Sequence, residues 1–162
     1  MRIGIISDHR GFELKEKIKK YFSDISIIDY GTNSNKIVDY PDYAFKLGKE
    51  INLKKVDLGI AICGSGIGMS IALNKVKGIR CARVTSIKDV IITRTDNDSN
   101  VIAFSSELNF NKVIRMIEEF INTSSSNLER HKRRIQKIHE YEINNWHIIY
   151  WWDYEKNISS FN

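Results

Sequence analysis

The chain is poor in cysteine and has no apolar run of the ~18 residues that a membrane-spanning helix requires. Its two cysteines, Cys63 and Cys81, lack the spacing of a disulfide framework, so no disulfide is implied and a reducing compartment fits better. The four histidines form no Cys/His cluster, which disfavours a metal site. No basic-then-apolar leader opens the sequence, and a cytoplasmic protein without a membrane segment is therefore expected.

The rest of the composition is typical of a soluble globular protein, with 42% hydrophobic and 28% charged residues among 162. This length supports one domain with a full core, and a second independent domain is not expected. The net charge of +5 is partly local, because Arg130, Lys132, Arg133, Arg134 and Lys137 follow one another closely. Such a basic run indicates a nucleic-acid site, a phosphate site or a solvated helix face.

Short apolar runs alternate with segments of helical periodicity along the chain. Strands are predicted at residues 2–7, 25–30, 58–62, 79–84 and 101–104, and helices at 12–22, from about 40 to 51, from the glycine turn to about 76, at 87–93, at 113–121 and from about 128. This alternation predicts an α/β fold, a Rossmann-like three-layer αβα sandwich with a five-stranded parallel sheet and a C-terminal helix. In such folds ligands bind beyond the carboxyl ends of the strands. That rule predicts that Asp8-His9, Cys63–Gly68 and Asp96–Asn100 converge at one edge of the sheet.

The segment from Ile60 to Asn74 reads as a buried strand that ends in a glycine turn and opens a helix. Backbone N–H groups of such a turn point one way, with the positive end of the helix dipole behind them, and can hold an anion. Cys63 on its rim would lie in the same field, which favours a thiolate. The alternative is a small apolar residue that ends a buried strand, and position alone leaves the two interpretations evenly matched.

Other motifs also have two interpretations. Asp8 could cap the following helix rather than take part in chemistry, and Asp39-Tyr40-Pro41-Asp42 could simply start a helix. Arg130 and Arg134 lie four residues apart on one helix face, where they could grip one phosphate or remain solvated. The glycine turn is not a Walker loop, because no Lys-Ser or Lys-Thr pair follows it. It is also a poor dinucleotide site, because no acidic residue closes a second strand about 20 residues later.

Together, these stretches resemble the ribose-5-phosphate isomerase B family, which also contains the galactose-6-phosphate isomerase subunits. The resemblance covers about residues 1–140 and leaves 141–162 as an aromatic extension rather than a separate domain. The matching stretches are Ser7–Lys15, Asp39–Ala44, Ile62–Ala72 with Asn74-Lys75, Gly78–Arg80, Asn97–Val101 and Arg130–Arg134.

The resemblance implies a metal-free and cofactor-free aldose–ketose isomerase that interconverts ribose 5-phosphate and ribulose 5-phosphate through an enediolate. Cys63 would move the proton between C1 and C2, with Ser65 beside it. The amides of the glycine turn would bind the oxyanion, at Gly64, Gly66, Ile67 and Gly68. Asp8 and Tyr43 would act on the ring oxygen, and Asn97 would bind the sugar hydroxyls. The phosphate would be bound by His9, Arg130 and Arg134. The resemblance also implies a homodimer in which the neighbouring subunit supplies the Asn97 region, with a dimer of dimers as an alternative assembly. Neither nucleic acid nor a membrane is an expected partner.

The sequence departs from the family pattern in its second half. Asp96 stands where the family usually has a ring-opening histidine, and Glu107 stands where an arginine is common. An aspartate can also act as a general acid or base, and Asp96 is therefore kept as a catalytic candidate. The departures leave two alternatives open, a hexose-6-phosphate isomerase of the galactose-6-phosphate type and a non-catalytic sugar-phosphate binder. The tail holds Trp146, Trp151 and Trp152, which are expected to pack on the subunit or its dimer partner.

Overall fold

The computed structural model describes the backbone of residues 1–158 and the side chains of residues 1–144. It divides into two units, Met1–Ser126 and a C-terminal unit that begins at Asn127. The strands are β1 (Ile3–Ser7), β2 (Ile27–Asp29), β3 (Leu58–Cys63), β4 (Cys81–Arg83) and β5 (Val101–Ser105). The helices are α1 (Phe12–Tyr21), α2 (Tyr40–Asn52), α3 (Ile67–Leu73), α4 (Ile87–Asn97), α5 (Phe110–Asn122) and α6 (Glu129–Ile158).

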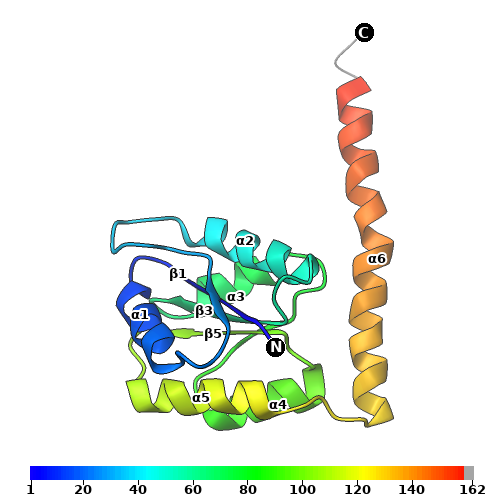
Figure 1. Ribbon diagram of the computed structural model, residues 1–162. Helices are drawn as coiled ribbons and strands as arrows, with labels where there is room; N and C mark the ends of the chain where they lie inside the picture. The colour runs from blue at the N-terminus through cyan, green and yellow to red at the C-terminus, as the bar shows by residue number, and fades with distance from the viewer. Residues whose placement is uncertain (159–162) are drawn as a thin grey trace. The chain divides into compact units, whose positions relative to one another are not determined.

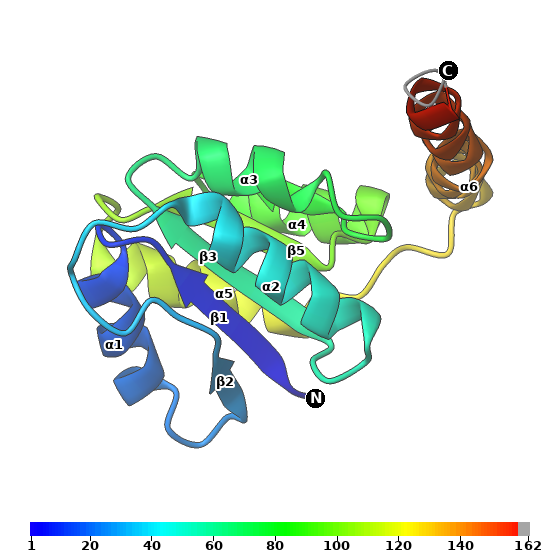
Figure 2. The same cartoon turned by 90° about the horizontal axis from the view of Figure 1, so that it is seen from above.

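The five strands form one parallel sheet in the order β2-β1-β3-β5-β4. Side chains alternate between its faces with the period of two that a strand imposes. Ile60 and Ile62 of β3 join the core built with α1, α4 and α5, whereas Ala61 and Cys63 join the core built with α2 and α3. Figure 1 shows helices on both faces, and Figure 2 looks down on the face that α2 and α3 cover. The predicted three-layer αβα sandwich is confirmed.

Helix α4 is longer than predicted. A capping box starts it, in which the Ser86 Oγ accepts from the Asp89 N–H and the Asp89 carboxylate accepts from the Ser86 N–H. Val90 and Thr93 of this helix are buried, and the helix continues to Asn97. Asp98 ends it in the left-handed region, with φ of 46°. Asp96 and Asn97 therefore belong to the last helical turn rather than to a polar loop.

The predicted convergence of Asp96–Asn100 with the two other polar turns is wrong within one chain. Asp8-His9 follows β1 and the Cys63–Gly68 turn follows β3, whereas Asp96–Asn100 precedes β5. All three strands run parallel, so residues before a strand lie at its amino edge. The Asn100 carbonyl indeed accepts from the N–H of Gly59, near the start of β3. The chain thus presents these polar segments at opposite edges of its sheet.

Helix α6 begins one residue after the predicted start and carries Arg130 and Arg134, both exposed. Its backbone continues as a helix through residue 158. The expected packing of Trp146, Trp151 and Trp152 lies outside the residues whose side chains are described. No helix in the described part of the chain has the length and apolarity to cross a membrane.

A buried ion cluster ties α1 to the end of β2. The side chain of Lys15 is fully buried and donates to both Asp29 and Glu16, and Lys19 Nζ lies 2.6 Å from Asp29 Oδ2. The other Asp29 oxygen accepts from the Gly31 N–H at 2.9 Å. Burial by itself raises the pKa of Asp29, but the hydrogen bonds from the two lysines and from Gly31 outweigh it, and its pKa lies below the usual value.

This cluster predicts that Asp29→Asn lowers the free energy of unfolding by about 3 kcal/mol at pH 7, because Lys15 loses a buried counter-ion. The contribution of Asp29 is present above its ordinary pKa and is lost as the pH falls through the lowered folded-state value. The difference between wild type and variant should therefore shrink in acid. Urea unfolding at several pH values measures it, with the exposed Asp24→Asn as the control. An equal loss at acid and neutral pH would contradict the ion-pair origin.

Candidate active site

The last residue of β3, Cys63, lies at the centre of the carboxyl edge of the sheet. Its side chain is buried, and the Gly66 N–H donates to Sγ at 3.1 Å. The thiol sulfur is therefore held as an acceptor at the mouth of the glycine turn. Cys81, the other cysteine, lies in β4, where burial raises the pKa of its thiol well above the usual range and keeps it protonated. Of the two cysteines, only Cys63 is placed for chemistry at this edge.

The turn after Cys63 fits closely against β5. Gly66 has φ of 76°, and a Cβ added there would lie 2.8 Å from the Cα of Phe104. Only glycine satisfies both conditions. Two further bonds hold the turn, from the Ser105 Oγ to the Gly64 carbonyl at 2.7 Å and from the Ser106 N–H to the Cys63 carbonyl at 2.8 Å. Packing and hydrogen bonds thus fix this backbone before any ligand arrives.

The amides of the turn are not equivalent. The Gly66 N–H is taken by Cys63, and the Ile67 N–H donates to the Ser65 Oγ at 3.2 Å. Within the described residues, the N–H groups of Gly64, Ser65 and Gly68 donate to no protein acceptor. Ser65 itself is exposed at the rim. This arrangement leaves three backbone donors and one hydroxyl in the turn after Cys63 for an anionic ligand.

Asp8 and His9 follow β1, which pairs directly with β3. The Asp8 N–H donates to the Ile62 carbonyl at 3.0 Å, so Asp8 lies beside the end of β3. Its buried carboxylate accepts from the Gly11 N–H at 3.0 Å. Gly11 is the N-cap of α1 and not a residue of its first turn. Asp8 therefore closes the turn between β1 and α1 and does not cap the helix, as one interpretation of the sequence had expected. His9 is half-buried, and its Nδ1 accepts from the Val38 N–H at 3.4 Å.

Two tyrosines from the start of α2 reach the same edge. The ring of Tyr43 lies against Gly31, where an added Cβ would meet Cδ1 at 2.8 Å. The Gly31 carbonyl in turn accepts from the Ser7 N–H at the end of β1, at 2.7 Å. The ring of Tyr40 lies against Gly68, where a Cβ would meet Cζ at 2.7 Å. Tyr43 was among the predicted site residues, whereas Tyr40 was predicted only as part of a helix start.

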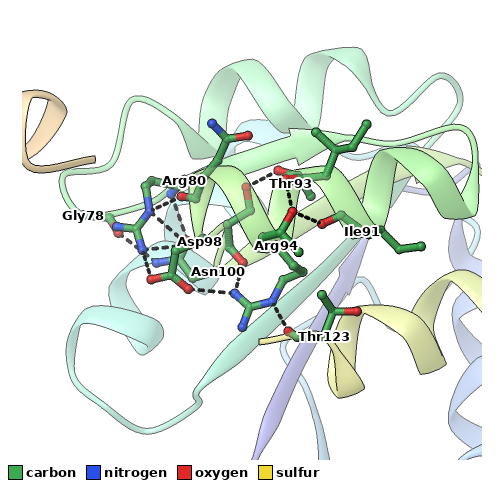
Figure 3. A network of polar contacts seen from close by, with 12 residues as sticks. Gly78, Arg80, Ile91, Thr93, Arg94, Asp98, Asn100 and Thr123 are labelled. Carbon is green, nitrogen blue, oxygen red and sulfur yellow. Dashed lines mark hydrogen bonds and ion pairs between the residues drawn. The ribbon is translucent and has the colours of Figure 1, made fainter. Parts of the chain in front are cut away.

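The predicted residues Asp96 and Asn97 lie at the opposite edge, in a turn that two arginines hold. Arg80 Nη2 and Arg94 Nη1 bind separate oxygens of Asp98 at 2.9 Å and 3.1 Å. Figure 3 shows these three side chains turned toward one another, with Arg94 also donating to the Thr123 carbonyl. The network fixes the end of α4 and the geometry of its last turn.

The predicted phosphate ligands Arg130 and Arg134 lie on α6, in the C-terminal unit. Both side chains are exposed, and the Arg130 Nε donates to the Nε2 of His131 at 3.0 Å. Their predicted role stays a prediction. No group of three or more His, Cys, Asp and Glu side chains gathers as a metal-ligand set among the described residues.

Sequence reasoning missed the contribution of the segment after β5. Ser105 and Ser106 clamp the Cys63 turn, and Glu107 forms an ion pair with Arg10, 2.7 Å between Nη2 and Oε1. The signal that could have found them is the strand order, since β5 lies beside β3 and shares its carboxyl edge. That order depends on tertiary packing and is not written in local sequence.

Comparison with known proteins agrees with this geometry. A family model described as Ribose/Galactose Isomerase matches residues 3–138. Ribose-5-phosphate isomerase B of Escherichia coli is 35% identical over 139 residues, which cover 85% of this chain and 93% of that protein.

Two solved structures extend the match to three dimensions. Ribose-5-phosphate isomerase B of Clostridium thermocellum superposes with a TM-score of 0.85 at 36% identity, covering 89% of this chain and 99% of the other. The corresponding enzyme of Mycoplasma genitalium, solved with bound ribulose 5-phosphate, has a TM-score of 0.80 at 36% identity, covering 87% of this chain and 95% of the other.

The turn geometry predicts that Gly66→Ala lowers the free energy of unfolding by about 2 kcal/mol or more, because it adds both a left-handed strain and a main-chain clash. Ser65→Ala is the matched control, since its side chain is exposed and makes only the hydrogen bond from the Ile67 N–H, and it should cost no more than about 1 kcal/mol. Denaturant unfolding of the two variants checks this. Equal stabilities would mean that the turn is not held against β5.

Proposed function

Because the chain belongs to the ribose/galactose isomerase family and is an aldose–ketose isomerase, we propose that it interconverts ribose 5-phosphate and ribulose 5-phosphate with Cys63 as the base. The observation that carries the proposal is the position of Cys63 at the end of β3, with its sulfur accepting from the Gly66 N–H. A sulfur oriented as an acceptor can also accept a proton from a carbon acid. The ribulose 5-phosphate bound to the Mycoplasma genitalium relative supports the choice of substrate.

The reaction needs no oxidant, because one proton moves between two carbons and another between two oxygens. Cys63 takes the C2 proton of the open-chain aldose and returns it to C1, through an enediolate. Negative charge develops on the oxygen beside the reacting carbons. The N–H groups of Gly64, Ser65 and Gly68 and the Ser65 hydroxyl are the donors of the turn that follows Cys63, and rigid donors of this kind stabilise such a charge without reorganisation.

Ring opening and phosphate binding are assigned to the residues around this centre. Asp8 and Tyr43 handle the ring oxygen, supported by their positions after β1 and on the first turn of α2. His9, Arg130 and Arg134 bind the phosphate, and the two arginines offer forked donors from one helix face. Fixing the far end of the sugar aligns its reacting carbons with the sulfur.

The amino-edge position of Asp96 and Asn97 supports a site shared between subunits. These residues cannot reach Cys63 of their own chain across the sheet, so they act on substrate only in a neighbouring molecule. We therefore propose a homodimer in which the α4 end of one subunit completes the site of the other, Asn97 binding the sugar hydroxyls and Asp96 assisting ring opening. A further pairing of dimers and the cytoplasmic location remain predictions.

A hexose phosphate is the second candidate substrate. Asp96 and Glu107 differ from the family pattern in the segments that would face the sugar, and the matching family also includes galactose isomerases. Comparing turnover of ribose 5-phosphate with that of a hexose 6-phosphate separates the two. Thermal stabilisation by ribose 5-phosphate without any turnover would instead favour a non-catalytic binder.

The thiol proposal predicts that Cys63→Ala lowers kcat by about a hundredfold or more, since general base catalysis contributes on that scale. Cys81→Ala is the matched control, because it removes a buried thiol from β4 and should keep kcat close to wild type. Formation of ribulose 5-phosphate in the presence of a metal chelator measures both. If Cys63→Ala and the wild type have the same kcat, Cys63 is not the base.

The shared site predicts complementation between two inactive variants. Cys63→Ala and Asn97→Ala should each be nearly inactive alone, whereas refolding them together produces dimers with one intact site. With random pairing of equal amounts, about a quarter of the wild-type activity should return. Mixing Cys63→Ala with Ser65→Ala is the control, because both changes then fall in the same half of the site. Absence of recovery in the first mixture would show that each subunit builds its site alone.

A further inference from the structure

Arg10 and Glu107 form an ion pair that bridges the carboxyl end of β3. Arg10 lies three residues after β1 and Glu107 two residues after β5, and these strands flank β3 on either side. Their side chains meet at 2.7 Å, between Nη2 and Oε1. The bridge therefore passes over the turn that begins at Cys63. Neither residue has been given a role in catalysis or in substrate binding above.

The guanidinium of Arg10 rests directly on Gly64. A Cβ added to Gly64 would lie 2.5 Å from the Arg10 Cζ and 2.8 Å from its Nε, so the contact requires a glycine there. Gly64 is the next residue after Cys63. The positive charge thus lies against the residue that follows the proposed base.

Glu107 is fixed by the same group that holds the turn. Its N–H donates to the Ser105 Oγ at 3.1 Å, and that hydroxyl donates to the Gly64 carbonyl. Ser105, Glu107 and Arg10 therefore close a ring of contacts around Gly64. A carboxylate alone at this position would repel an anionic substrate, and Arg10 neutralises it.

The ion pair is accessible and replaceable. The two side chains are 56% and 72% exposed, and exposed pairs of this kind are weak and screened by salt. A guanidinium also has enough donors to keep one carboxylate oxygen while it binds another anion. Arg10 can therefore contact a ligand at the turn without leaving Glu107.

We propose that Arg10 contacts the substrate and stabilises the negative charge on its C1 and C2 oxygens, and that Glu107 is the positioning residue for Arg10. This rests on the proposed function, since those carbons must lie at Cys63 for proton transfer. We place Arg10 at these oxygens and not at the phosphate, which is carried by C5, because its guanidinium lies on the residue that follows Cys63. The planar guanidinium of Arg10 carries parallel N–H donors, which can bind the two neighbouring oxygens on C1 and C2 at once.

The test is steady-state kinetics of Arg10→Gln, Arg10→Lys, Glu107→Ala and the double variant Arg10→Gln with Glu107→Ala. Arg10→Gln should lower kcat by about tenfold to a hundredfold with KM changed by less than about threefold, because the charge acts on the transition state. Arg10→Lys should recover part of the loss. Glu107→Ala should lower kcat less, and should add no further loss when Arg10 is already Gln.

A second measurement works without turnover. Calorimetry with a phosphorylated hydroxamate, which mimics the planar enediolate, should show weaker binding to Arg10→Gln by a similar factor, with melting temperatures unchanged. Unchanged kcat and unchanged affinity for the mimic would overturn the proposal, and so would a loss confined to KM, which would place Arg10 at the phosphate. If the wild-type protein isomerises ribose 5-phosphate and Arg10→Gln has the same kcat, only the proposal for Arg10 is refuted. Wild-type protein without isomerase activity refutes the proposed function instead.

Discussion

Gly66 lies against the main chain of Phe104, and the arrangement of the candidate site depends on this contact. The left-handed φ of Gly66 turns the chain back toward β5, and the lack of a Cβ allows the two backbones to approach. That approach brings the Gly66 N–H to Cys63 and lets Ser105 bind the Gly64 carbonyl. A thiol, the donor amides of the glycine turn and the end of the neighbouring strand are thereby held at one place. The rigidity comes from packing between adjacent strands, so a ligand meets donors that are already oriented.

The parallel sheet decides which residues one chain can bring together. Segments that follow β1, β3 and β5 share the carboxyl edge, and they supply Asp8, Cys63 and Glu107. The end of α4 precedes β5 and lies at the amino edge, where Arg80 and Arg94 hold Asp98. A function that uses both edges requires a second molecule. This constraint connects the topology of the subunit to the proposed dimer, in which each site draws on two chains.

Electrostatics at the carboxyl edge is built from paired rather than isolated charges. Lys15 is buried with Asp29, which also binds the Gly31 N–H, and Gly31 supports the ring of Tyr43. Arg10 is paired with Glu107 at the surface above the Cys63 turn. The first pair is buried and fixes the backbone, whereas the second is exposed and can exchange contacts with a ligand. Ion pairs thus fix the backbone at Asp29 and, in the proposal for Arg10, hold at Glu107 the guanidinium that binds the ligand.

The sequence by itself determined the fold class, the five strands and the Cys63 turn. The strands follow from the local periodicity of apolar residues, and the turn follows from closely spaced glycines, which favour backbone conformations that other residues avoid. It also determined the family, since the motifs occur together and in order. The expected convergence of Asp96 and Asn97 with Cys63 did not follow from the predicted topology, because a segment that precedes a strand of a parallel sheet lies at its amino edge. Only the length of α4 depended on tertiary packing. Tertiary structure alone decided that Arg10 meets Glu107, ninety-seven positions later in the chain, across β3. Strand order is a property of the whole core, and no local pattern near either residue encodes it.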